Sequence, residues 1–448
     1  MNTYFFLIVI IIFLLLSLFI TEGDLFFPSN IVMVMYLLSL FFLIGEMKKW
    51  DGNLSFKGMS LLLLGLTIYL IVALVVFMVT SRTTLSSHNI SINLTKSNTV
   101  AKEKLPVIDK RITIIIILYE IFATLKYYLD VKNSSSSVGL YSSFSEMIGN
   151  YRNAGAYGTL NVGISAISAY NYQIMLALAY VYASVVTQNL ALKEKTSLKW
   201  KLLHWSPIVI YGICSIFTGG RNPLINLGLA TIVMYFIKLR QINKINPLKF
   251  KTIFRLVLGG SLALVAFSSF RGLVGRTSDY TTFDYLAMYI GAPIKLFDLF
   301  INGSPITHRF VGQETFTSFL GDIGKDVGNS NLEFRSSNGF GLGNVYTPFR
   351  RYYSDFGITG LMVLTSLQSF IYSLYYSIIV KKRVNNGIDF FTILYSYMFV
   401  GVVYYSVDER LYTYFFSRNT IKGMLFMLFF AYILPKIKIK IREVNLKF

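Results

Sequence analysis

The sequence predicts an all-α polytopic integral membrane protein with about 11 transmembrane helices (about 10–12) and one large extracytoplasmic loop. Two observations carry this prediction. Apolar residues make up 54% of the chain and charged residues only 14%, against roughly 45–50% and 25% in soluble domains. Apolar runs of about 20 residues, the length that crosses a bilayer, recur from end to end. These runs are continuous rather than alternating, which excludes a transmembrane β-barrel.

The length of the apolar runs gives the expected spans. No linker or soluble domain interrupts these runs, so we expect residues 1–448 to form a single polytopic domain. The first run resembles a secretory signal, but it lacks a basic segment before it and a small-residue cleavage site after it. We therefore expect an uncleaved span. The single cysteine, Cys214, excludes a disulfide framework. The expected spans are about 3–20, 29–46, 58–80, 112–129, 162–187, 202–218, 222–238, 252–270, 355–380, 390–407 and 421–435.

The net charge of +20 has two explanations, a nucleic-acid surface or the enrichment of cytoplasmic loops in basic residues. The basic residues lie between spans instead of forming one basic domain, which favours the second and predicts no nucleic-acid partner. Lysine-rich segments at 188–201, 238–251 and 381–383 then lie in the cytoplasm. The same count puts the N-terminus outside, with Lys48, Lys49 and Lys57 on the unexpected face, so the topology before residue 80 stays open.

The segment 271–354 is the largest feature of the opposite face, and it is expected to form part of the active site. Its stretch 283–301 is apolar enough to lie in the membrane interface. Lysine predominates in the cytoplasmic segments, whereas this loop prefers arginine, whose planar fork binds phosphate in bidentate fashion. The bias predicts a phosphate-binding face, or else arginines that meet lipid headgroups. The arginines are Arg271, Arg276, Arg309, Arg335, Arg350 and Arg351.

Two arginines lie where spans end. Arg221 follows Gly219 and Gly220 in a very short turn, and Arg271 ends the span at 252–270. Charged groups at membrane depth are costly and are functional candidates by default, although a side chain that merely reaches the headgroups gives the same pattern. Pro223 suggests a helix start after Arg221, whose positive end would reinforce anion binding.

The stretch NVYTPFRRYYSDFGITG at 344–360 places a double arginine and a carboxylate where the chain re-enters the membrane. Arg350 and Arg351 are expected to close a polar pocket there. Asp355 is either a residue that meets the dipole of the following helix or a base for a sugar hydroxyl. Three tyrosines either line a sugar site or belong to an interfacial aromatic belt; they are Tyr346, Tyr352 and Tyr353.

Absent motifs narrow the function further. There is no Walker loop, which argues against ATP-driven transport. Only three histidines and one cysteine occur, so a zinc site is not expected and neither metal nor cofactor is predicted. The glycines of NGFGLGN at 338–344 lack the strand–helix context of a dinucleotide site and are expected to form a flexible connection.

The order of these features resembles bacterial oligosaccharide repeat-unit polymerases, the O-antigen and capsular polysaccharide polymerase (Wzy-type) family. The resemblance covers the chain after residue 110. The most specific stretch is 344–360, and the others are short: TGGRNPLI at 218–225, SSFRG at 268–272, YIGAPIKLFDLF at 289–300 and GQETF at 312–316.

The resemblance implies a metal-independent glycosyltransferase of GT-C-like architecture in the bacterial cytoplasmic membrane. Its substrates would be undecaprenyl-diphosphate-linked repeat units at the extracytoplasmic face, and the growing glycan would pass onto the incoming unit. Membrane lipids are expected partners, and a chain-length regulator and a flippase are further candidates. Alternatives are an O-antigen ligase, which shares the donor, and a flippase or transporter of the lipid-linked unit.

For such chemistry, arginines are the expected contacts of the departing diphosphate, because they stabilise its developing charge without a metal. Asp355 is the first candidate for acceptor activation, Glu314 the second and His308 the third. The expected diphosphate or glycan contacts are Arg221, Arg271, Arg276, Arg350, Arg351, Tyr346, Tyr352 and Tyr353.

Overall fold

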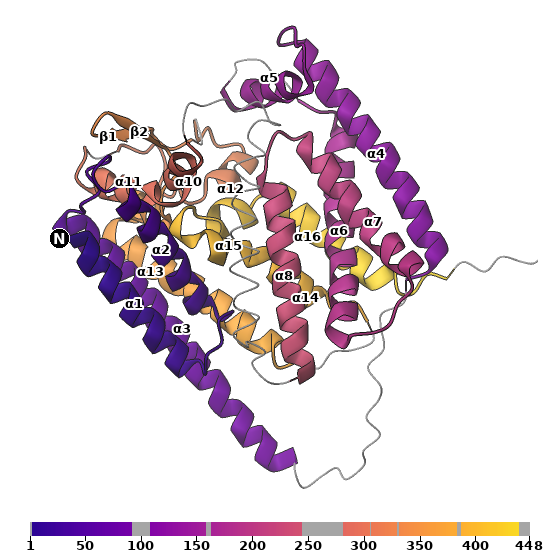
Figure 1. Ribbon diagram of the computed structural model, residues 1–448, viewed down its shortest axis with the longest axis horizontal. Coiled ribbons are helices and arrows are strands. Elements are labelled where there is room, and N and C mark those ends of the chain that lie inside the picture. The colour runs from indigo at the N-terminus through magenta and orange to yellow at the C-terminus, as the bar shows by residue number, and fades with distance from the viewer. Residues whose placement is uncertain are drawn as a thin grey trace, which may run out of the picture.

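The computed structural model describes residues 2–91, 108–157, 163–243, 281–304, 306–328, 331–382 and 387–438. Almost all of its regular structure is helical (Figure 1). Three long apolar helices open the chain: α1 (Asn2–Ile20), α2 (Pro28–Gly45) and α3 (Phe56–Ser91). They are followed by α4 (Lys110–Ser136), α5 (Phe144–Tyr157), α6 (Ala166–Leu192), α7 (Leu198–Ile216) and α8 (Asn222–Asn243).

The second half of the chain begins with shorter elements. They are α10 (Thr282–Ile290), α11 (Ala292–Ile301), α12 (Thr317–Asp322), β1 (Arg335–Ser337) and β2 (Phe340–Gly343). The long α13 (Pro348–Ile379) follows, and then α14 (Phe390–Met398), α15 (Val400–Val403), η1 (Tyr404–Ser406), η2 (Leu411–Phe415) and α16 (Arg418–Ile433).

Within the described residues, seven helices are long and apolar enough to cross a membrane: α1, α2, α3, α4, α6, α8 and α13. The expected number of about 11 is therefore not reached by this criterion. The expected spans at 202–218 and 421–435 form helices, α7 and α16, but these do not combine the length and hydropathy of the seven. The expected span at 390–407 is a shorter apolar segment, 390–406, and the one at 252–270 lies outside the described residues.

The two ends of the helical bundle carry different segments of the chain. We call the end that carries residues 281–347 the loop end; α10, α11, β1 and β2 gather there beside the start of α1 (Figure 1). At the opposite end, Gln241 of α8 donates to the carbonyl of Ile379 at 3.0 Å, and Tyr376 donates to Asp24 in the α1–α2 turn at 3.0 Å. The turns of the two ends thus alternate along the chain, as expected for a polytopic bundle.

The lysines before residue 80 that the charge pattern leaves unexplained lie at the loop end. Lys49 forms an ion pair with Asp284 at 2.6 Å, and Lys57 donates to the carbonyl of Ile301 at 3.2 Å. Ser55, two residues before Lys57, donates to the carboxylate of Asp298 in α11. Lys49 and Lys57 therefore hold the α2–α3 turn to the large loop. These contacts explain why lysines lie at this end of the bundle, without reference to the rule that basic residues favour cytoplasmic loops.

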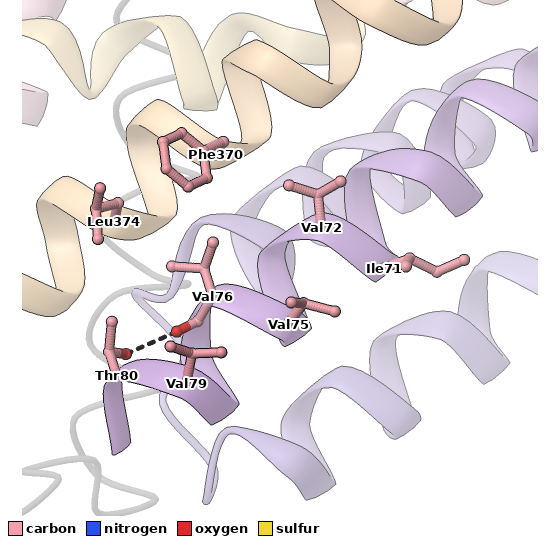
Figure 2. A pocket seen from close by; sticks show the side chains of 8 residues that line it. All are labelled: Ile71, Val72, Val75, Val76, Val79, Thr80, Phe370 and Leu374. Carbon is pink, nitrogen blue, oxygen red and sulfur yellow. Dashed lines mark hydrogen bonds between the residues drawn. The ribbon is translucent and has the colours of Figure 1, made fainter. Parts of the chain in front are cut away.

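α3 and α13 lie side by side and form the closest helix pair near the large loop. Gly65 of α3 makes the approach possible, because a Cβ there would lie 2.5 Å from the ring of Phe349. Further along, the pair leaves an apolar groove of about 260 Å³ on the outer surface, lined by Val75, Val79 and Phe370 among others (Figure 2). The hydroxyl of Thr80, the one polar residue among the described residues that line the groove, donates to the backbone carbonyl of Val76 at 2.8 Å. An otherwise apolar groove with half-exposed rim residues is the kind of surface that lipid chains cover.

Two local expectations near the site are corrected by the structure. The span expected from residue 355 begins at Pro348, with Thr347 as its N-cap residue. α13 is kinked at Gly357, whose φ of 63° and ψ of −153° are not helical. Asp355 therefore lies at the end of a first helical stretch, and the apolar stretch begins just after the kink, close to the expected boundary. The segment 338–344 is not a loose connection: it forms the turn and second strand of a hairpin, with Ser337 opposite Phe340. Asn338 and Gly339 take positive φ values of 49° and 80°, which short hairpin turns require.

Candidate functional site

Five of the candidate residues come together at the loop end. α13 supplies Arg350, Arg351 and Asp355 from its first turns, and the segment before α12 supplies His308 and Glu314. Glu314 and Arg350 are 36 residues apart in sequence, and His308 and Asp355 are 47 residues apart. We call these five residues, together with Glu333, the arginine–carboxylate cluster.

Arg350 lies at the centre of this cluster and is completely buried. Its Nη1 donates to the Glu314 carboxylate, and its Nη2 donates to Glu333 Oε2 at 2.6 Å. The guanidinium also lies 4.3 Å from the centroid of Phe300 and 5.3 Å from that of Tyr346, within cation–π range. Two carboxylates therefore neutralise Arg350, and an anionic ligand has to displace one of them to reach it.

Arg351 is placed differently. Its Nη1 donates to the backbone carbonyl of Glu314 at 2.7 Å, and the residue is partly exposed. Within the described part of the chain no carboxylate oxygen lies within 4.0 Å of its nitrogens. A guanidinium held by one carbonyl keeps its charge and most of its donors available for an anion.

Asp355 holds the backbone of the neighbouring segment. Its carboxylate accepts hydrogen bonds from the amides of Glu314, at 3.1 Å, and Thr315, at 2.6 Å. The side chain is fully covered. In this geometry the covered carboxylate of Asp355 fixes the turn that carries Glu314.

His308 lies between the two carboxylates. Its Nε2 is 2.7 Å from the Ser354 hydroxyl and 3.9 Å from both Glu314 Oε1 and Asp355 Oδ1. A small movement of the ring would bring it into hydrogen-bond distance of either carboxylate, so the imidazole can exchange a proton with this pair.

The two glutamates of the cluster differ in proton affinity. Burial raises the pKa of Glu314 above its ordinary value, and the charge of Arg350 opposes this only in part. Burial acts in the same direction on Glu333, but the hydrogen bond and the charge of Arg350 outweigh it and lower the pKa of Glu333. Glu333 therefore serves as the permanent counter-ion of Arg350, and Glu314 is the carboxylate better suited to accept and release a proton.

Arg221 also lies at the loop end, just before α8. Its Nη2 donates to the Tyr285 hydroxyl at 2.5 Å, and the guanidinium lies 5.3 Å and 5.8 Å from the centroids of Tyr285 and Tyr289. Gly219 has a φ of +68°, which allows the sharp turn before it. Arg221 is thus oriented by α10 instead of by the arginine–carboxylate cluster. Arg271 and Arg276 lie outside the described residues.

The three candidate tyrosines have different surroundings. Tyr346 donates to the carbonyl of Glu333 at 3.0 Å and forms part of the wall around Arg350. Tyr353 forms a T-shaped ring contact with Phe300. Tyr352 is completely buried and donates to Gln368 at 2.5 Å, so it supports α13 from within and does not line an accessible surface.

Sequence patterns gave little indication of Glu333 and Glu409. Glu409 is almost completely buried and accepts hydrogen bonds from the amides of Tyr412 and Thr413 at 2.9 Å and 2.7 Å. Burial raises its pKa, and the charge of Arg351 is among the influences that lower it. Glu333 is an isolated carboxylate in the sequence and Glu409 directly follows Asp408. Only the fold shows that both glutamates lie near α13.

Comparison of the chain with protein-family models, with curated proteins and with solved structures finds no match.

Proposed function

We propose that the chain is a membrane glycosyltransferase that polymerises lipid-diphosphate-linked oligosaccharide units, as the resemblance of its sequence implies. The observation that carries the proposal is the arginine–carboxylate cluster. It combines guanidinium groups with carboxylates and an imidazole at one end of an apolar helical bundle. Transfer of a glycan from a lipid diphosphate requires stabilisation of a departing diphosphate and activation of an acceptor hydroxyl.

The contacts suggest a distribution of roles. Arg351 is the first candidate for the diphosphate, because no carboxylate pairs with it among the described residues. Glu314 is the better candidate for acceptor activation, since its pKa is raised and part of its side chain is exposed. Asp355 positions the turn that carries Glu314, and His308, 3.9 Å from Glu314 Oε1, supplies or receives the proton of Glu314. The bond that breaks joins the sugar to the diphosphate, and the acceptor oxygen forms the new bond as it loses its proton.

In this proposal the loop end faces outward and the lysine-bearing end faces the cytoplasm. The lysine-rich segments before α7 and after α13, which include Lys195, Lys199 and Lys381, support this orientation, since basic residues favour cytoplasmic loops. A ligase would use the same donor and the same cluster; the stretch 344–360 favours the polymerase.

The test supplies a synthetic polyprenyl-diphosphate oligosaccharide to the purified protein in nanodiscs, with no other acceptor present. A polymerase converts it into a ladder of longer lipid-linked products, which gel electrophoresis and mass spectrometry detect. A ligase without its acceptor, or a transporter, leaves the substrate unchanged. Failure to form any ladder with folded protein would contradict the proposal.

A further inference from the structure

A second group of polar side chains lies at the loop end, between the first turns of α6 and α16. Here the helices leave a hollow of about 190 Å³. Its polar lining consists of two tyrosines, two amides and one ammonium group: Tyr170, Tyr172, Gln173, Asn419 and Lys422. The hollow is smaller than the roughly 300–1,000 Å³ of a pocket for a drug-sized ligand, and it suits a single ring.

The geometry of the lining is well defined. Lys422 Nζ lies 4.7 Å from the ring centroid of Tyr170 and 3.4 Å from its hydroxyl, and Tyr170 is about half exposed. Gly423 lets Gln173 approach α16 closely, because a Cβ at this position would lie 3.0 Å from Gln173 Oε1. The ammonium group and an aromatic face are thus presented beside an amide that the helix contact holds in place.

The hollow borders the segment that also carries the cluster's Glu314. The backbone amide and the guanidinium of Arg418, the first residue of α16, donate to Asp322 of α12 at 2.5 Å and 2.8 Å. Asn419 is the next residue, and α12 begins three residues after Glu314. One short segment therefore connects both groups of polar side chains at the loop end.

We propose that this hollow binds one acidic sugar unit, a sugar ring that carries a carboxylate, of a lipid-linked glycan; the proposal rests on the function proposed above. Aromatic rings pack against the apolar faces of sugars, and amides both donate to and accept from hydroxyl groups. The ammonium of Lys422 matches a single carboxylate. A lipid phosphate matches the planar fork of a guanidinium group better, and no arginine is among the described residues that line this hollow.

The test measures binding of p-nitrophenyl β-glucuronide and the neutral p-nitrophenyl β-glucoside to the full chain in phosphatidylcholine nanodiscs, by saturation-transfer NMR. The glucuronide binds more tightly. Lys422→Gln weakens glucuronide binding about five-fold, as expected for one hydrogen bond to a charged group in a partly exposed site, and leaves glucoside binding unchanged. Tyr170→Ala weakens both. Lys436→Gln serves as a matched control, because Lys436 lies over Tyr432 beyond the other end of α16.

Three results would overturn the proposal: no binding of either sugar, equal binding of both, or an unchanged glucuronide affinity in Lys422→Gln. If the purified wild-type protein retains phosphatidylglycerol and Lys422→Gln loses this lipid without any change in sugar affinity, the hollow is a lipid phosphate site instead. Gln173→Ala, which weakens both sugars, gives a second measurement if a first variant unfolds. If the protein binds the glucuronide through Lys422 but forms no ladder of products, the proposed polymerase function is wrong and this binding site stands. If the protein forms a ladder but Lys422 does not affect glucuronide binding, this binding site is wrong and the polymerase function stands.

Discussion

Replacing Arg350 with methionine is expected to destabilise the protein strongly, whatever reaction it catalyses. The substitution keeps an unbranched side chain but removes the cation between Glu314 and Glu333. These carboxylates have side-chain exposures of only 12% and 28%, so they remain partly desolvated and face each other. Removing one partner of a buried ion pair costs about 3–5 kcal/mol, and loss of the contact with Phe300 adds about 0.5–2 kcal/mol. Since Glu333 retains some solvent, we expect the low end of this sum, about 3.5 kcal/mol in total.

The assay is thermal unfolding in nanodiscs, followed by intrinsic fluorescence, on Arg350→Met and on a variant that also carries Glu314→Gln and Glu333→Gln. Removing the two negative charges should restore more than half of the lost stability, because the amides no longer repel each other. The matched control is Arg309→Met. Its partner is Asp326, the pair is 67% and 78% exposed, and its loss costs about 0–1 kcal/mol. If Arg350→Met melts like Arg309→Met, or if the triple variant melts no higher than Arg350→Met, the buried ion-pair interpretation is wrong.

Three other predictions use different observations. Activity should fall as the pH drops through the raised pKa of Glu314, since a base must be deprotonated; Glu314→Gln should lower turnover about 10²–10⁴-fold and remove this acid limb from the pH–rate profile. Arg221→Lys should shorten the polymer, because lysine keeps the charge but loses the fork that Tyr285 orients; chain lengths equal to the wild type would contradict this. Gly65→Val should lower stability by about 1–3 kcal/mol through its clash with Phe349, compared in thermal unfolding with Gly228→Ala, where nothing lies within 4 Å.

The membrane class and most helices could be predicted because they depend on local composition. An apolar run of bilayer length has few alternatives to a helix, and the runs near 3–20, 29–46 and 58–80 became α1, α2 and α3. Boundaries were less accurate where polar residues lie inside a helix. The span was expected from residue 355, close to the kink at Gly357, but the charges of Arg350 and Arg351 conceal the additional helical stretch that begins at Pro348.

The site was predictable only in part. The double arginine and Asp355 stood out because charged residues are rare at the start of an apolar run. The carboxylates that pair with Arg350 did not stand out. The hairpin separates Glu333 from Arg350 in the sequence, α12 and the hairpin separate Glu314 from it, and no local sequence period relates these residues. The role of Asp355 also depended on the fold: its hydrogen bonds to the amides of Glu314 and Thr315 form between distant segments.

The central claim is that a guanidinium without a carboxylate partner in the described structure, that of Arg351, holds the departing diphosphate without a metal. The most direct measurement is the ladder reaction in the presence of EDTA with wild type, Arg351→Lys and Arg309→Lys. We expect the wild type and Arg309→Lys to form ladders with the chelator present, and Arg351→Lys to accumulate single lipid-linked units. A normal ladder from Arg351→Lys, or loss of the wild-type ladder in EDTA, would contradict the account.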